Sequence, residues 1–315
     1  MEVKKYLIKK FRDYYKKNKI PLPRSLKNRE FAFVPFESLP DFVMKRHISF
    51  NSEEEFRNYV IFETPAHVYY SSAYYEKPYE ENMEKKRWIG ADLVFDIDAD
   101  HLPIKTNSID RALSRAKSEV KKLLKILSLD FGVREVEVYF SGGRGYHVHV
   151  LDGDFQELRS PERRELVDYL TLNNPKIFEK ENFLESNAVI RIKKFLSKKG
   201  IQEKDMKKKK ILQFAIEKLR VYIDVPVTTD VKRLIRMPGS LHGKTGLKVV
   251  KVEDIDSFDP FRDAVAFGDD KIKVRILKKV KIKVDSHELN FTSGETAEVP
   301  EFLAIYLLCR GFATI

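Results

Sequence analysis

Residues 94–103, VFDIDADHLP, place three aspartates and a histidine in one short apolar stretch of a basic chain. The alternation of apolar and acidic residues predicts a β-strand, in which residues two positions apart face the same side. Phe95 and Ile97 would then face a core, and Asp96 and Asp98 would face the other way. At about 3.3 Å per residue their Cα atoms lie roughly 6.5 Å apart, where two carboxylates repel each other unless a cation lies between them.

A hard divalent cation with oxygen ligands would remove this repulsion. Two such ions about 3.5–4 Å apart suit in-line phosphoryl transfer. The alternative is a polar strand edge whose aspartates face water or bind lysines. The strand should comprise ADLVFDIDAD, residues 91–100, so Asp92 and Asp100 lie on the same side at its ends, and we expect them to be surface carboxylates.

The composition predicts a globular protein with a polyanionic partner. The chain has 315 residues, 43% of them hydrophobic, and 59 Lys plus Arg against 48 Asp plus Glu give it a formal charge of +11. A basic excess of this size suits nucleic acid, although it also serves solubility alone. The single cysteine, Cys309, excludes a disulfide framework or a thiolate zinc site within one chain. With no secretory signal and no long apolar segment, we expect a soluble, cytoplasmic protein without a membrane contact.

Helices and strands alternate along the chain. Residues 4–18 have helical spacing, Ser52 ahead of three glutamates is an N-cap signature, and residues 134–152 predict two strands around a glycine-rich turn. Residues 160–220 and the tail from 299 to 315 predict helices. This hairpin among helices indicates an α/β (α+β) fold with a mixed sheet rather than a purely parallel one.

The glycine-rich turn lies in YFSGGRGYHVHV, residues 139–150. Glycines let the backbone approach a ligand closely, and Arg144 offers a planar fork suited to phosphate. His147 and His149 share one strand face, where they could bind a metal, donate to a phosphate or simply be polar. A plain hairpin turn is the alternative, and the spacing of a P-loop is missing.

A third stretch, TTDVKRLIRMPGSLHGKTG at residues 228–246, begins with one aspartate and continues with cations. Asp230 is either the N-cap of a short helix or a third metal ligand. The basic residues that follow it suggest a cradle for a triphosphate, although basic surface loops are common.

In this order, the three stretches resemble the small catalytic subunit of the archaeal-eukaryotic type of DNA primase. NREFAF at 28–33 and VMKRHISF at 43–50 extend the resemblance, which covers about 1–155 and 221–265. It implies three catalytic, metal-binding aspartates: Asp96, Asp98 and Asp230. It also implies residues that hold the phosphates of the incoming nucleotide: Ser141, Arg144, His147, Arg236, His242 and Arg46.

The resemblance further implies synthesis of short primers on a single-stranded DNA template from nucleoside triphosphates, in DNA replication. Two Mg²⁺ or Mn²⁺ ions would serve as cofactors, and a large regulatory subunit would complete a heterodimer. We expect one catalytic domain over 1–315 with a helical insertion at 155–220. Many members carry a zinc-binding insertion after the aspartate pair, but no cysteine is available there, so we expect no structural zinc. The alternatives are a non-catalytic single-strand-binding module on the same fold and a two-metal nuclease.

Overall fold

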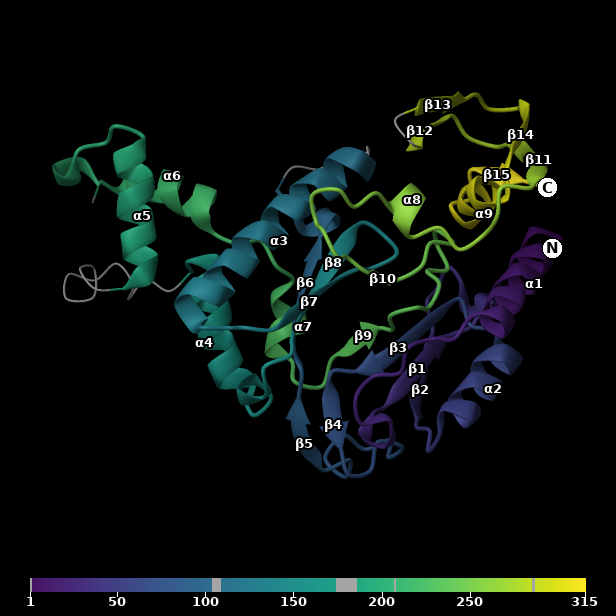
Figure 1. Ribbon diagram of the computed structural model, residues 1–315, viewed down its shortest axis with the longest axis horizontal. Coiled ribbons are helices and arrows are strands. Elements are labelled where there is room, and N and C mark those ends of the chain that lie inside the picture. The colour runs from purple at the N-terminus through teal and green to yellow at the C-terminus, as the bar shows by residue number, and fades with distance from the viewer. Residues whose placement is uncertain (1, 104–108, 174–185, 207, 285–286) are drawn as a thin grey trace.

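The computed structural model describes residues 2–103, 109–173, 186–206, 208–284 and 287–315. Two four-stranded sheets lie across the middle of the molecule and are flanked by helices (Figure 1). The helices are α1 (Glu2–Lys17), α2 (Glu53–Glu63), α3 (Ile109–Phe131), α4 (Ser160–Thr171), α5 (Asn187–Lys198), α6 (Lys209–Leu219), α7 (Val225–Thr229), α8 (Pro260–Asp263) and α9 (Glu301–Cys309). Short 3-10 turns lie at Leu26–Asn28, Phe36–Ser38, Ala99–His101, Gly153–Phe155 and Glu203–Asp205.

The first sheet has the order β2-β1-β3-β9, formed by Lys45–Ile48, Phe31–Val34, His67–Ser71 and Leu234–Arg236. Its central strands are buried because both faces are covered. Phe56 of α2 packs on Phe31, with ring centroids 5.3 Å apart. The predicted N-cap of α2 is confirmed, since the Ser52 hydroxyl accepts a hydrogen bond of 3.1 Å from the backbone of Glu55.

The second sheet has the order β10-β7-β8-β6, formed by Val250–Lys251, Val136–Phe140, Gly145–Val150 and Leu93–Asp98. The predicted hairpin is β7–β8, and β6 pairs with β8 so that Asp96 lies opposite His147. The predicted strand ends at Asp98, two residues early, because the Asp98 carboxylate accepts the Asp100 N–H at 2.9 Å and starts a 3-10 turn. Ile97 faces the core, as expected.

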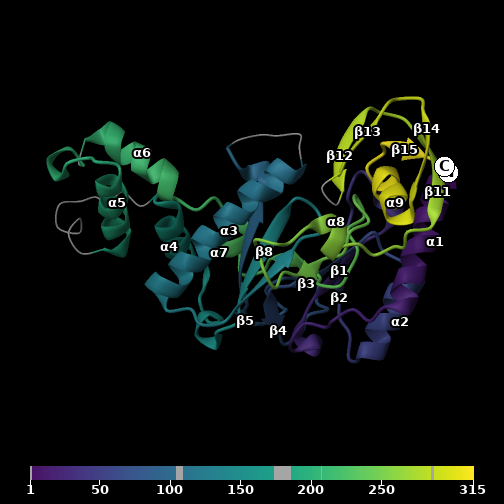
Figure 2. The same ribbon diagram turned by 45° about the horizontal axis from the view of Figure 1, so that its top comes forward.

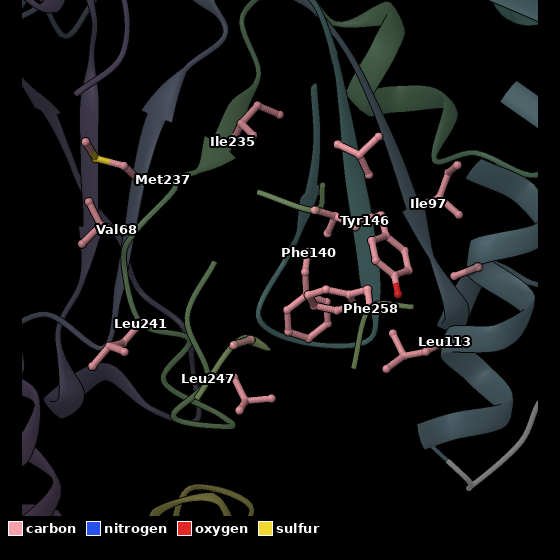
Figure 3. Packing of buried hydrophobic residues seen from close by; sticks show 14 of the residues in the cluster. Val68, Ile97, Leu113, Phe140, Tyr146, Ile235, Met237, Leu241, Leu247 and Phe258 are labelled. Atoms are coloured by element: carbon pink, nitrogen blue, oxygen red, sulfur yellow. The ribbon is translucent and has the colours of Figure 1, made fainter. Parts of the chain in front are cut away.

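One core joins both sheets to the helices that cover them. Figure 3 shows Phe140, Tyr146 and Phe258 packed together beside the second sheet, with Leu113 of α3 close by. The rings of Phe140 and Phe258 have centroids 5.2 Å apart. The apolar side of the aspartate strand is thereby fixed, so its acidic side must face away from this core.

A buried arginine also connects the sheets. Arg29 is 1% exposed and donates to the carbonyls of Ser71 and Ser72 at 2.8 and 2.7 Å. It also pairs with Asp92 at 2.6 Å. The expectation that Asp92 is a surface carboxylate is therefore wrong, because this side chain neutralises a buried guanidinium that would otherwise lack a counter-charge.

The segment between the second sheet and α7 is helical in its described parts. Helix α4 packs on the main core through Leu166 and Leu170. Helices α5 and α6 are held by a separate cluster that includes Ile192 and Leu196. They lie at the opposite end of the molecule from α9, as Figures 1 and 2 show. Residues 174–185 and 207 of the expected insertion lie outside the described residues, and the division into domains stays a prediction.

The chain ends in a small antiparallel sheet, β14-β11-β15, which comprises Thr296–Pro300, Lys271–Ile276 and Ala313–Thr314. Two hairpins complete the strands, β12–β13 (Val280–Val284 and His287–Phe291) and β4–β5 (Ala73–Tyr75 and Trp88–Ala91). The tail predicted as helix is helical only in α9. The α+β class is confirmed, although every strand pair among the described residues is antiparallel. Within the described residues, no helix has the length and apolarity needed to cross a membrane.

Candidate active site

A cavity of about 400 Å³ opens where the two sheets meet. Both sheets and the connection from α7 to β9 line it, and it contains five of the nine predicted site residues. Those five are Arg46, Asp96, His147, Asp230 and Arg236. The lining carries four cationic side chains, Arg46, Lys232, Arg233 and Arg236, against three carboxylates, Asp96, Asp224 and Asp230. Such a mixture suits an anionic ligand that is bound together with divalent cations.

Helix α7 brings the acidic residues of the third stretch to the aspartate strand. The backbone N–H of Asp224 donates to the carbonyl of Asp96 at 2.8 Å. The Thr228 hydroxyl donates to the carbonyl of Val94 at 3.0 Å. These two bonds dock the helix along β6. The same cavity is therefore lined by Asp96, by Asp224 and by Asp230, the residue that ends the helix.

Asp230 lies at the C-terminal end of α7, where its N–H donates to the carbonyl of Pro226 at 3.1 Å. The alternative that Asp230 is a helix N-cap is therefore wrong, because the helix precedes it. Its side chain accepts the N–H of Lys232 at 2.9 Å, which turns the chain toward the first sheet.

Asp98 does not line the cavity, since its carboxylate caps the 3-10 turn that follows β6. Across the described parts of the chain, no three His, Cys, Asp or Glu side chains form a group that could hold a metal ion. The three-aspartate ligand set therefore stays a prediction. Asp96 and Asp230 line one cavity, whereas Asp98, one of whose carboxylate oxygens caps the turn, does not.

Arg236 ties the glycine-rich turn to the first sheet. It extends from β9, donates to the carbonyl of Ser141 at 2.9 Å and donates to the Tyr69 hydroxyl at 2.9 Å. Ser141 belongs to the second sheet's hairpin and Tyr69 to β3, so one guanidinium spans both sheets. Its remaining cationic surface borders the cavity.

The two predicted site histidines are buried and neutral. Burial lowers the pKa of His147 well below its ordinary value, and the nearby His149 and Arg236 act in the same direction. The pKa of His242 is lowered in the same way, by burial and then by Arg236. The Nε2 atom of His147 lies 3.8 Å from a carboxylate oxygen of Asp96. A neutral imidazole can still donate one hydrogen bond to an anionic ligand.

His242 supports the glycine-rich turn from behind. Its Nδ1 lies 3.0 Å from the Thr245 hydroxyl, which donates to the carbonyl of Gly142 at 2.6 Å. Gly142 has a φ of +78°, and a Cβ there would lie 2.7 Å from the Cβ of His242. The turn therefore requires glycine at this position, for both space and backbone conformation.

The remaining predicted residues lie away from the cavity lining. Arg144 pairs with Asp100 at 2.5 Å beyond the end of β6. His149 faces a separate cavity of about 250 Å³, which Glu137 and Tyr139 also line. The functional assignment of Arg144 stays a prediction.

Besides the predicted aspartates, histidine and basic residues, the polar side chains of the lining include Asp224 and Tyr69, which were not predicted for the site. The signal for Asp224 was its place directly before a Val-Pro helix start, six residues ahead of Asp230. Tyr69 gave no signal, because aromatic residues in a buried strand are ordinary core residues.

Comparison with known proteins agrees with this geometry. Residues 95–255 match the DNA primase small subunit family. The chain is 53% identical to the DNA primase small subunit PriS of Archaeoglobus fulgidus, over 100% of this chain and 99% of that protein. It is 35% identical to the protein of the same name from Methanococcoides burtonii, over 99% and 98% of the two chains.

Among solved structures, the polymerase domain of Mycobacterium tuberculosis ligase D in complex with DNA aligns with a TM-score of 0.44 and 11% identity, over 81% of this chain and 83% of that one. The family match and the full-length relatives confirm the family predicted from the three motifs. The chain belongs to the DNA primase small subunit family.

Proposed function

We propose that the chain is the catalytic subunit of a DNA primase, which joins nucleoside triphosphates into short primers on a single-stranded DNA template. The observation that carries the proposal is the cavity of about 400 Å³ lined by both sheets, where carboxylates of β6 and of the ends of α7 meet cations that include Arg46 of β2 and Arg236 of β9. A module that only binds single strands needs the cations but has no use for converging carboxylates.

The donors that line the cavity fit Mg²⁺ or Mn²⁺. Asp96, Asp224 and Asp230 offer carboxylate oxygens, which are the ligands these hard cations prefer. Asp98 is the further ligand that the sequence predicts. Divalent ions bound here would activate the 3′-hydroxyl of the primer and neutralise charge on the leaving pyrophosphate.

The chain's own cations would hold the nucleotide. Arg236, fixed by Ser141 and Tyr69, presents its charge to the cavity, and Arg46 does so from β2. Neutral His147 would donate a hydrogen bond to a phosphate oxygen. Holding the triphosphate in one orientation brings its α-phosphate to the position where the hydroxyl attacks. Ser141, Arg144 and His242 are the remaining residues proposed for this phosphate site.

The template and the partner follow from the same assignment. The formal charge of +11 suits a single-stranded DNA template. A large regulatory subunit would form a heterodimer with this chain, and replication would take place inside the cell.

A primer-synthesis assay tests the proposal. Purified chain, single-stranded template, labelled nucleotides and Mg²⁺ or Mn²⁺ should yield new oligonucleotides. Asp96→Ala should abolish them while the protein remains folded. Asp256→Ala is the matched control, because this carboxylate is 68% exposed and pairs with Lys121 away from the cavity.

Full synthesis by Asp96→Ala would refute the assignment of the site. Template binding without any product in the wild type would favour the single-strand-binding module. Shortening of a labelled template would indicate a nuclease.

A further inference from the structure

A fully buried carboxylate, Glu30, lies immediately before β1 and contacts the base of Arg46. One of its oxygens accepts from Nε of Arg46 at 3.1 Å and from the backbone N–H of His47 at 3.3 Å. The other lies 3.3 Å from the ammonium group of Lys86, which is also fully buried. Glu30 itself does not line the cavity, so it contacts no ligand there.

The strand that carries Arg46 is irregular at this point. The register between β1 and β2 shifts between Phe31 and Phe33, and His47 has a φ of +63°. A bulge of this kind redirects the neighbouring side chains, and a left-handed non-glycine residue needs support from its surroundings. The bond from the N–H of His47 to Glu30 supplies that support.

The charges of the cluster leave Arg46 available for a ligand. Lys86 neutralises Glu30, so the guanidinium of Arg46 remains as a net positive charge at the cavity. Glu30 accepts from Nε of Arg46, and the two terminal nitrogens make no hydrogen bond to any of the described residues. A guanidinium held by Nε presents those nitrogens as a fork, which matches the geometry of a phosphate.

We propose that Glu30 is a positioning residue for the nucleotide site, which fixes the bulge in β2 and aims the fork of Arg46 at the terminal phosphates of the nucleoside triphosphate. The inference rests on the proposed function. Glu30 acts through Arg46 and makes no contact with substrate, so removing it should raise the KM for nucleotide and leave kcat largely unchanged.

Two double variants isolate this role from the stability of the buried ion pair. Glu30→Met with Lys86→Met removes both charges and the acceptor for Arg46, and a well-packed apolar pair avoids a buried unpaired charge. Glu30→Gln with Lys86→Met also removes both charges but keeps an oxygen acceptor. We expect the KM for nucleotide to be about tenfold higher in the first variant than in the second, the effect of losing one charge-assisted hydrogen bond.

The same pair in an Arg46→Ala background completes the cycle. If Glu30 acts through Arg46, the tenfold difference should vanish there. Equal KM values in the original pair, or a difference that persists without Arg46, would overturn the inference. Glu63→Gln is the control, since this carboxylate pairs with Lys45, the residue next to Arg46, at 2.6 Å and should leave KM unchanged.

Arg46→Lys keeps the test decisive if the buried variants fail to fold. Arg46 is 38% exposed in its side chain, so the fold should tolerate lysine. Lysine keeps the charge but has no fork, and it should raise KM as the first double variant does; an unchanged KM would overturn the inference. Titration of a fluorescent ATP analogue should report the same order of affinities. Absence of primer synthesis by the wild type would instead refute the proposed function.

Discussion

Replacing Arg236 by lysine should weaken both the fold and the nucleotide site. The guanidinium donates to the carbonyl of Ser141 and to the hydroxyl of Tyr69, each at 2.9 Å, and so connects the two sheets. A lysine keeps the positive charge, but its single nitrogen at the end of a flexible stem cannot reproduce the fork that reaches both partners.

The expected loss is one hydrogen bond from a charged donor to a buried or half-buried acceptor. Such a bond contributes about 1.5–3 kcal/mol, so the free energy of unfolding should fall by this amount. Tyr69→Phe removes only the bond to the hydroxyl and leaves the bridge to Ser141. The lost bond again has a charged donor, so we expect a similar loss of about 1.5–3 kcal/mol.

Urea unfolding at pH 7 measures both changes through the midpoint, provided that the m-value stays constant. Arg233→Lys is the matched control. Arg233 lies three residues earlier and lines the same cavity, and its side chain makes no hydrogen bond to the part of the chain that the structure describes. A midpoint for Arg236→Lys equal to that of Arg233→Lys would refute the idea that this residue joins the sheets. Nucleotide affinity should also fall for Arg236→Lys, because the glycine-rich turn loses its tie to β9.

Three further predictions concern acid stability, strand packing and metal binding. Burial lowers the pKa of His149 from its ordinary value of 6.5 to about 4, so between these values the unfolded chain binds a proton that the native protein does not. Acidification from pH 7 to pH 5 should therefore lower the free energy of unfolding by about 2 kcal/mol through this group, and His149→Gln should lack this loss. Equal pH dependence of the urea midpoints of the wild type and His149→Gln would contradict this. A Cβ on Gly145 would lie 2.5 Å from the carbonyl oxygen of Ile97, so Gly145→Ala should lower the free energy of unfolding by about 1–3 kcal/mol. Gly153→Ala is the control, because a Cβ there has no neighbouring atom within 4 Å and should not lower stability. A wild-type melting temperature for Gly145→Ala would show that the strands can separate without cost. The asparagine of Asp98→Asn can still cap the 3-10 turn, so the fold should persist. The affinity for Mn²⁺, measured by titration calorimetry, should fall about tenfold or more. An unchanged affinity would remove Asp98 from the ligand set.

Local patterns in the sequence predicted the local structure. The alternation around Asp96 fixed which side of β6 faces the core, because one apolar face must be buried and the side-chain period is two. The hairpin and the cap at Ser52 depend on residues within a few positions of each other, so they too could be read from the chain. The order of the three motifs indicated the family correctly.

Contacts between distant residues could not be predicted in this way. Arg29 and Asp92 are 63 residues apart, and no local pattern indicates that this acid neutralises a buried guanidinium. Likewise the predicted strand was two residues too long, because a carboxylate that can bind a metal can also cap a turn. Asp224 was missed since a residue before a Val-Pro helix start has a sufficient local explanation.

The connection from α7 to β9 explains why the three motifs must occur together. It starts on the second sheet, where the N–H of Asp224 bonds to Asp96, and ends in the first sheet, where β9 pairs with β3. Along this path the acids come first and the cations follow, ending at Arg236. The order along the chain is therefore matched in space at its two ends, since Asp224 is bonded to the aspartate strand and Arg236 to the glycine-rich turn. A nucleoside triphosphate bound along this gradient would have its reacting phosphate near the acids and its terminal phosphates near the cations, which is the polarity that primer extension requires.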